Sequence, residues 1–175
     1  MVVLAGGGST RFGGVDKAML VLEGMSLLDR VLTATAGAAS IVVVGPVRTT
    51  YRDVDWTVED LPSGGPVAGL AAGLQHGTAP VIVVVSCDLP WITQADVMTL
   101  VNNLAEHDGF GLRDTDGQEQ QLATAYRRTA LAKAIHDVGD PRDKSVRRTL
   151  AGLDLAWTEP SHAGDDVDTW ADLDD

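Results

Sequence analysis

The sequence contains a single cysteine, Cys87, and few basic residues. One cysteine excludes an intramolecular disulfide and is typical of a reducing compartment. Only 13 Lys and Arg stand against 25 Asp and Glu, which gives a formal net charge of −12. Because a surface this acidic repels phosphate backbones and anionic lipids, the composition argues against nucleic-acid and membrane partners.

Long apolar segments are also missing. No run approaches the roughly 20 apolar residues that span a bilayer. The first residues, MVVLAGGG, lack the basic region and the long apolar run of a signal peptide. We therefore expect a cytoplasmic protein. Its 175 residues, 45% of them apolar, are enough for one packed core, so we predict a single domain over residues 1–175.

Short runs rich in valine and isoleucine predict strands that are covered on both faces. They lie at residues 1–5, 40–45 and 80–88. A further strand is predicted at 55–59, and weaker ones at 109–113 and 121–127 around the polar turn DTDGQEQ.

Helical patterns lie between these strands. The expected helices cover residues 26–37, 66–77, 93–107, 129–138 and 143–151, with a short one at DTWADL. Ser26 and Thr93 are predicted N-caps, each with an aspartate three residues later, and Pro66 occupies a tolerated first position. Strands that alternate with helices of this length indicate βαβ units. The predicted fold class is therefore α/β, with a mostly parallel central sheet.

A glycine-rich segment, LAGGGSTRFGGVDK at residues 4–17, follows the first predicted strand. It fits neither the GxGxxG dinucleotide pattern nor the P-loop pattern, because Arg11 stands where the former needs glycine and no Gly-Lys-Ser/Thr step is present. Successive amides at a strand end still bind anions well, and Arg11 and Lys17 add full positive charges. The segment predicts a local phosphate site; a surface turn with incidental charges is the alternative interpretation.

Asp88 ends the most apolar predicted strand and precedes Leu89 and Pro90. If this strand and the first are parallel, the Asp88 carboxylate and the glycine-rich segment emerge at the same edge of the sheet. A carboxylate beside a phosphate site is suited to Mg²⁺, which takes few protein oxygens together with waters and ligand phosphates. A helix cap or turn is an equally good interpretation of Asp88 taken alone.

Other carboxylates are weaker candidates. Asp60 also follows a predicted strand and precedes several glycines, although it equally suits a turn before Pro62. Asp166 and Asp168 are two residues apart and face the same way if the chain is extended there. As part of an acidic tail they are otherwise solvated, and Asp168 also suits the cap of a short helix.

The remaining reactive residue types carry no chemistry by their pattern. The four histidines show no metal-ligand spacing, and we interpret them as structural. Cys87 lies within an apolar strand and is interpreted as a buried small hydrophobic residue.

Five stretches of the sequence, in this order, resemble one known family. LAGGGSTRFGGVDKAML resembles the first motif of nucleotidyltransferases of the molybdenum cofactor guanylyltransferase type, and VEDLPSGGPVAGLAAGL and CDLP resemble the second and third. QQLATAYRR and DVDTWADL resemble the fourth and fifth. The resemblance covers nearly the whole chain. Departures include Gly45, where some members have asparagine, and Asp166 and Asp168, which replace asparagine or mixed residues.

The resemblance implies a Rossmann-like three-layer nucleotidyltransferase fold. It implies Mg²⁺-dependent transfer of GMP from GTP to the phosphate of molybdopterin carrying molybdenum, with release of pyrophosphate. Proteins that deliver the pterin and enzymes that receive the product would be partners. The implied nucleotide-binding residues are Leu4, Ala5, Gly6, Gly7, Lys17, Asp60 and Asp88; the implied metal ligands are Asp88 and Asp168; the implied catalytic residues are Arg11, Lys17 and Asp88.

Two alternatives remain open on the sequence. A cytidylyltransferase of the same cofactor or a sugar-phosphate nucleotidyltransferase would share the fold and differ in base or acceptor. A non-catalytic, nucleotide-binding regulatory protein is the alternative from another class, although simple binding could dispense with either Lys17 or Asp88. The basic stretch RDKSVRR at 142–148 could contact the pterin phosphate, but we favour a solvated helix face.

Overall fold

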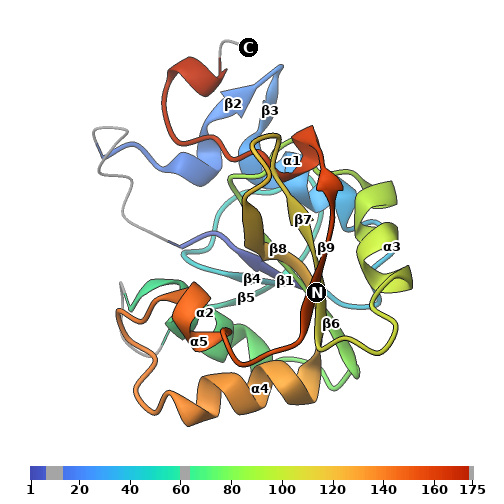
Figure 1. Ribbon diagram of the computed structural model, residues 1–175. Helices are drawn as coiled ribbons and strands as arrows, with labels where there is room; N and C mark the ends of the chain where they lie inside the picture. Colours follow the sequence, from blue (N-terminus) through green and yellow to red (C-terminus); the bar gives the residue numbers. More distant parts are fainter. Residues whose placement is uncertain (7–13, 60–63, 174–175) are drawn as a thin grey trace.

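The computed structural model describes residues 1–6, 14–59 and 64–173, and the structural statements below concern these ranges (Figure 1). Seven strands form one sheet in the order β5-β4-β1-β6-β8-β7-β9. Their bounds in that order are Asp55–Thr57, Val42–Val44, Val2–Leu4, Val81–Ser86, Glu119–Arg127, Gly109–Arg113 and Leu155–Pro160.

The sheet is mostly parallel. β5, β4, β1 and β6 run parallel, with Val2 of β1 opposite both Val42 and Val84. β8 runs antiparallel to its neighbours β6 and β7, and β9 is again parallel to β7. One strand therefore reverses direction within a parallel sheet. The predicted α/β class with a mostly parallel sheet is confirmed.

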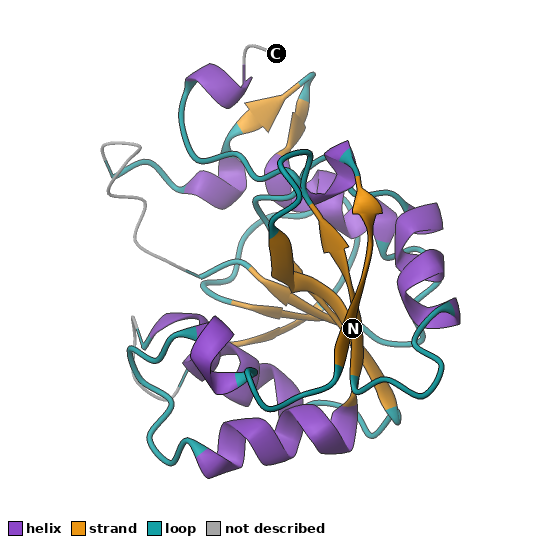
Figure 2. Ribbon diagram, viewed as in Figure 1, coloured by secondary structure: helices purple, strands orange, loops and turns teal. Residues whose placement is uncertain are grey.

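Helices cover both faces of the sheet (Figure 2). α1 (Leu27–Ala34) and α3 (Gln94–Asn102) pack on one face, and α2 (Gly65–Leu74), α4 (Arg128–Asp137) and α5 (Val146–Thr149) on the other. Val3 of β1 belongs to the core under α1, whereas Val2 and Leu4 belong to the core under α2. Because successive residues of a strand point to opposite faces, both sets must be apolar, which explains the unbroken valine runs.

Two of the predicted helix starts are confirmed. The Ser26 hydroxyl accepts a hydrogen bond from the Asp29 amide at the start of α1. Thr93 and Asp96 form a reciprocal capping box at the start of α3. α1 is shorter than the predicted helix over residues 26–37, because it ends at Ala34. The Thr35 hydroxyl there donates to the Leu32 carbonyl, a local hydrogen bond that competes with the regular helical pattern.

Two elements are absent from the sequence-based prediction. β2 (Val21–Leu22) and β3 (Met25–Ser26) form a small antiparallel hairpin apart from the main sheet. Its two-residue turn, Glu23 and Gly24, has positive φ at both positions, as a type I′ turn requires. β9 was also not predicted, because it lacks valine and isoleucine and ends on Pro160, which a strand at the edge of the sheet tolerates.

The last predicted helix, DTWADL, is a single 3₁₀ turn, η4 (Ala171–Leu173). The predicted helix at 143–151 is likewise reduced to the four residues of α5. In the part of the chain that the structure describes, no helix has the length and apolar character needed to cross a membrane.

Candidate functional site

The carboxyl ends of β1 and β6 lie side by side at the centre of the sheet. Leu4 pairs with Ser86 at these ends, and the Cys87 amide donates to the Leu4 carbonyl at 2.9 Å. The connection from β1 leads to β4 on one side, whereas β6 lies on the other, so strand order reverses here. Such a switch point is where open α/β sheets bind ligands. Gly6 and Asp88 therefore emerge at the same edge, as the sequence predicted for parallel strands.

Lys17 is held beside this edge by a short turn with its own supports. It begins the 3₁₀ helix η2 (Lys17–Met19), whose N-cap Asp16 accepts from the Ala18 amide at 3.2 Å. Arg48, in the loop after β4, donates to both oxygens of Asp16, from Nε at 2.6 Å and Nη2 at 3.0 Å. A bidentate pair of this kind fixes orientation as well as distance. The buried Ala18 anchors the same turn in the core.

The Lys17 ammonium joins two carboxylates that are far apart in the sequence. Nζ donates to Asp88 Oδ2 and to Asp168 Oδ1, each at 3.0 Å. The lysine side chain is 18% exposed, so water screens these contacts only partly. Burial alone would lower the pKa of Lys17, but the charge of Asp88 and hydrogen bonds with Asp168 and Asp88 outweigh it, and the pKa is raised. Lys17 therefore stays charged at neutral pH.

The C-terminal segment, residues 165–173, is held beside this site by contacts of Val167. The Val167 amide donates to the Asp88 carbonyl at 2.9 Å, and its side chain is fully buried with Leu20, Leu22 and Leu27. These leucines come from the residue after η2, the β2–β3 hairpin and the start of α1, which lie next to the C-terminal segment in Figure 1. The residues on either side of Val167 are thereby turned toward Asp88.

Three carboxylates meet at this point. One oxygen each of Asp88, Asp166 and Asp168 lies within 4.8 Å of the others. Asp166 is an exposed residue, but partial burial of its carboxyl raises its pKa, and the charges of Asp168 and Asp88 raise it further. Carboxylate oxygens gathered in this way are the ligands that Mg²⁺ prefers. The residues present therefore fit a Mg²⁺ ion.

On the other side of Asp88, the ends of β1 and β4 approach each other closely. The Ala5 amide donates to the Val44 carbonyl at 2.8 Å, and Leu4 is tied to Cys87 as described above. Gly45 follows β4 with φ of +147°, and its amide donates to Thr57 at 2.9 Å. A Cβ on Gly45 would lie 2.7 Å from the Ala5 carbonyl oxygen. Only glycine lets the two strand ends meet beside Gly6.

Gly45→Ala is expected to destabilise the protein by about 2 to 4 kcal/mol, because it combines a positive φ with a backbone clash. Thermal unfolding should show this as a fall in Tm of roughly 5 to 15 °C. Gly152→Ala is the matched control, since a Cβ there meets no atom within 4 Å. Equal Tm values for the two variants would contradict the proposed close approach.

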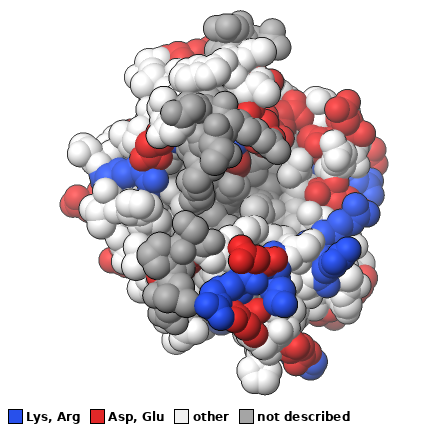
Figure 3. Space-filling view, turned by 90° about the vertical axis from the view of Figure 1, so that its left-hand side faces the viewer, with Lys and Arg blue, Asp and Glu red and all other residues white. Residues whose placement is uncertain are grey.

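Several predicted site residues lie outside the described residues: Gly7, Arg11 and Asp60. Next to the last of them, Glu59 accepts a hydrogen bond from the Gly64 amide at 2.7 Å, at the start of α2. Sequence reasoning missed Glu59, as it missed Asp16, Arg48 and Val167. Figure 3 shows that acidic and basic groups lie close together on one face of the molecule.

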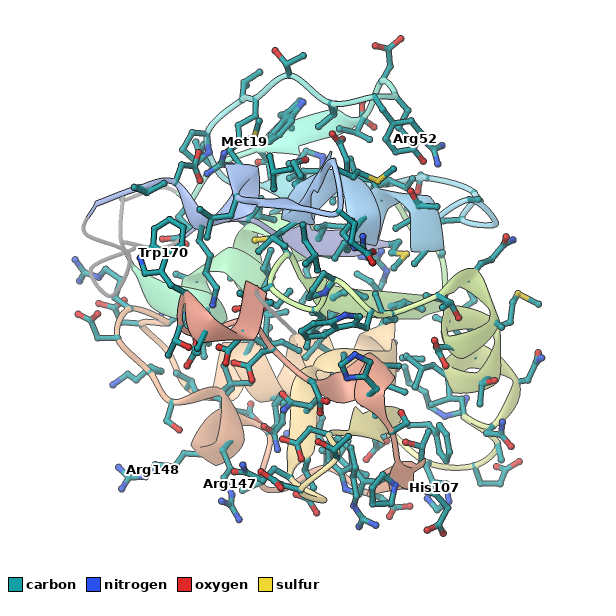
Figure 4. The ribbon with its side chains drawn as sticks, turned by 90° about the horizontal axis from the view of Figure 1, so that it is seen from above. Met19, Arg52, His107, Arg147, Arg148 and Trp170 are labelled. Carbon is teal, nitrogen blue, oxygen red and sulfur yellow. The ribbon has the colours of Figure 1, made fainter. Side chains whose placement is uncertain are left out.

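Cys87 and His162 are among the residues interpreted as structural. Cys87 is buried, and burial raises its pKa to about 12, so it is a thiol at neutral pH. The His162 ring stacks on Trp91 with a centroid distance of 4.2 Å, and its Nδ1 lies 2.7 Å from Asp165 Oδ2. In the basic stretch, Arg147 and Arg148 extend outward from α5 and are exposed (Figure 4), which agrees with a solvated face.

Comparison with known proteins adds a family to this geometry. Residues 1–157 match the model of the MobA-like NTP transferase domain. A protein of Serratia proteamaculans named molybdenum cofactor guanylyltransferase is 32% identical over 162 residues, which cover 89% of this chain and 79% of that protein.

Two solved structures share the fold. The molybdopterin-guanine dinucleotide biosynthesis protein A of Archaeoglobus fulgidus has a TM-score of 0.74 at 20% identity, and the match covers 99% of this chain and 94% of that protein. The 2-C-methyl-D-erythritol 4-phosphate cytidylyltransferase of Thermus thermophilus has a TM-score of 0.71 at 18% identity, with 98% and 94% covered. These likenesses show the nucleotidyltransferase fold. The family match over residues 1–157 shows that the chain belongs to the MobA-like NTP transferases.

Proposed function

We propose that this protein transfers GMP from GTP to the phosphate of molybdopterin carrying molybdenum, in a Mg²⁺-dependent reaction that releases pyrophosphate. The observation that carries the proposal is the convergence of Lys17 with three carboxylates at the switch point of the sheet. The similarity to relatives named molybdenum cofactor guanylyltransferase supports the choice of donor and acceptor.

The reaction requires one bond to form and one to break at the α-phosphorus. An oxygen of the acceptor phosphate attacks, and the bond to the bridging oxygen of pyrophosphate breaks on the opposite side. The protein contributes little covalent chemistry to such a transfer. Its task is to align two anions that repel each other and to neutralise the charge that develops between them.

The residues divide this task by their positions. Lys17, on its supported 3₁₀ turn, binds phosphate oxygens of the nucleotide through its ammonium. Asp88 and Asp168, with Asp166, hold Mg²⁺, which when bound neutralises phosphate charge. The nucleotide is bound through main chain at Leu4, Ala5, Gly6 and Gly7 and by Asp60, and Arg11 adds a second cation at the phosphates.

The donor is tested by supplying one acceptor with different nucleotides. Purified protein is incubated with molybdopterin carrying molybdenum, Mg²⁺ and GTP, CTP or UTP, and pyrophosphate release is measured. We expect GTP to be used at least about 100-fold more efficiently, since base discrimination depends on buried hydrogen bonds. Equal or faster turnover of CTP would replace the proposal by a cytidylyltransferase, which the shared fold with a cytidylyltransferase keeps as the second candidate.

A non-catalytic role has its own signature in the same experiment. Tight GTP binding without pyrophosphate release, at every Mg²⁺ concentration and with the acceptor present, would contradict the proposed reaction. Calorimetric titration of GTP beside the release assay distinguishes this outcome from inactive protein, which would not bind GTP either.

A further inference from the structure

The ammonium of Lys17 lies between two of the three carboxylates of the site. Nζ is 3.0 Å from Asp88 and 3.0 Å from Asp168, two of the three members of the carboxylate cluster. A divalent ion held by the cluster uses oxygens of the same two carboxylates. Two cations on shared ligands in a partly buried site repel each other strongly. Lys17 and a divalent ion are therefore competitors for this cluster.

The structure also shows which part of Lys17 can move. Its backbone is fixed by the Asp16 cap, the Arg48 pair and the buried Ala18. The four-carbon stem is flexible, and a lysine ammonium is a compact charge that changes partners by rotation of its side chain alone. A nucleotide phosphate beside Gly6 would offer the ammonium a new anionic partner without any movement of the fold.

We propose that Lys17 is the built-in counterion of the Asp88–Asp166–Asp168 cluster and opposes the binding of a divalent ion until nucleotide phosphate draws the ammonium away. Binding of the nucleotide therefore favours binding of the metal, and the two bind cooperatively. The inference rests on the proposed function for the nucleotide's part in it. Its first half, the competition between ammonium and metal, concerns the described residues alone.

The competition is tested with Mn²⁺ as the probe, in the absence of nucleotide and acceptor. Free Mn²⁺ is measured by electron paramagnetic resonance during titration of the wild type and of Lys17→Met. We expect the variant to bind Mn²⁺ about tenfold or more tightly, because Asp88 and Asp168 lose their ammonium. Lys133→Met is the matched control: it removes the same charge from an exposed pair with Asp137 on α4, and should bind Mn²⁺ like the wild type.

A second variant keeps the inference testable if Lys17→Met fails to fold because its three carboxylates repel one another without the ammonium. Lys17→Met combined with Asp166→Asn keeps the net charge of the cluster while freeing the other two carboxylates. It should still bind Mn²⁺ more tightly than the wild type, and circular dichroism checks that each variant is folded. Unchanged or weaker Mn²⁺ binding by the folded variants, or no Mn²⁺ binding by any protein, would overturn the inference.

This result is separate from that of the transferase assay. If the protein fails to transfer GMP but Lys17→Met binds Mn²⁺ more tightly than the wild type, the counterion inference stands and the proposed donor or acceptor is wrong. If the protein transfers GMP but Lys17→Met leaves the Mn²⁺ affinity unchanged, the proposed function stands and the counterion inference is wrong.

Discussion

Replacing Lys17 with methionine is expected to lower kcat/KM for nucleotidyl transfer about 100- to 1,000-fold, or about 3 to 4 kcal/mol of transition-state stabilisation. Methionine keeps the length and apolar character of the lysine stem and removes only the charged group that donates to Asp88 and Asp168. The loss should fall mainly on kcat, because negative charge grows on the leaving phosphate oxygens as the bond breaks.

The control for this variant is Lys133→Met, which should retain wild-type kinetics because Lys133 lies exposed on α4. Lys17→Arg adds a finer comparison. It preserves the charge but replaces a compact ammonium by a planar fork, so we expect a partial loss between the wild type and Lys17→Met. Wild-type kcat/KM for Lys17→Met, measured at saturating Mg²⁺, would show that Lys17 plays no part in the chemistry.

The parallel half of the sheet could be predicted because its strands are buried on both faces. Runs such as VIVVVS of β6 have no polar alternation, since helices cover the sheet above and below. The β2–β3 hairpin and β9 escaped prediction for the opposite reason. The hairpin strands are two residues long, and β9 is stabilised by pairing with β7 rather than by its own composition.

The site divides in the same way. Lys17 and Asp88 could be proposed from sequence, because each stands next to a strand end or glycine-rich segment with a known chemical preference. The facing of Asp166 and Asp168 followed from their spacing. The contacts that hold these side chains in place could not be predicted from the sequence. Arg48 pairs with Asp16 across 32 residues, and Val167 packs against leucines more than 130 residues away. Local patterns do not encode such partners, which only the folded chain brings together.

Asp88→Asn is expected to reduce nucleotidyl transfer about 1,000-fold at millimolar Mg²⁺, the largest effect of any single substitution considered for this site. Asparagine has nearly the same shape, and the Asp88 carbonyl that accepts from Val167 belongs to the backbone, so the C-terminal segment stays attached. The substitution therefore removes one negative oxygen donor from the cluster and one charged partner of Lys17, and leaves the backbone contacts in place. Thermal unfolding should show a Tm close to that of the wild type.

The dependence on Mg²⁺ separates a metal ligand from a residue that merely supports Lys17. If Asp88 holds the ion, activity of Asp88→Asn should rise with Mg²⁺ at concentrations that saturate the wild type, because the weakened site fills only there. Asp154→Asn is a control of the same chemistry at an exposed carboxylate paired with His107, and its Mg²⁺ profile should match the wild type. Identical Mg²⁺ profiles for Asp88→Asn and the wild type would remove Asp88 from the metal site and leave it only as a partner of Lys17.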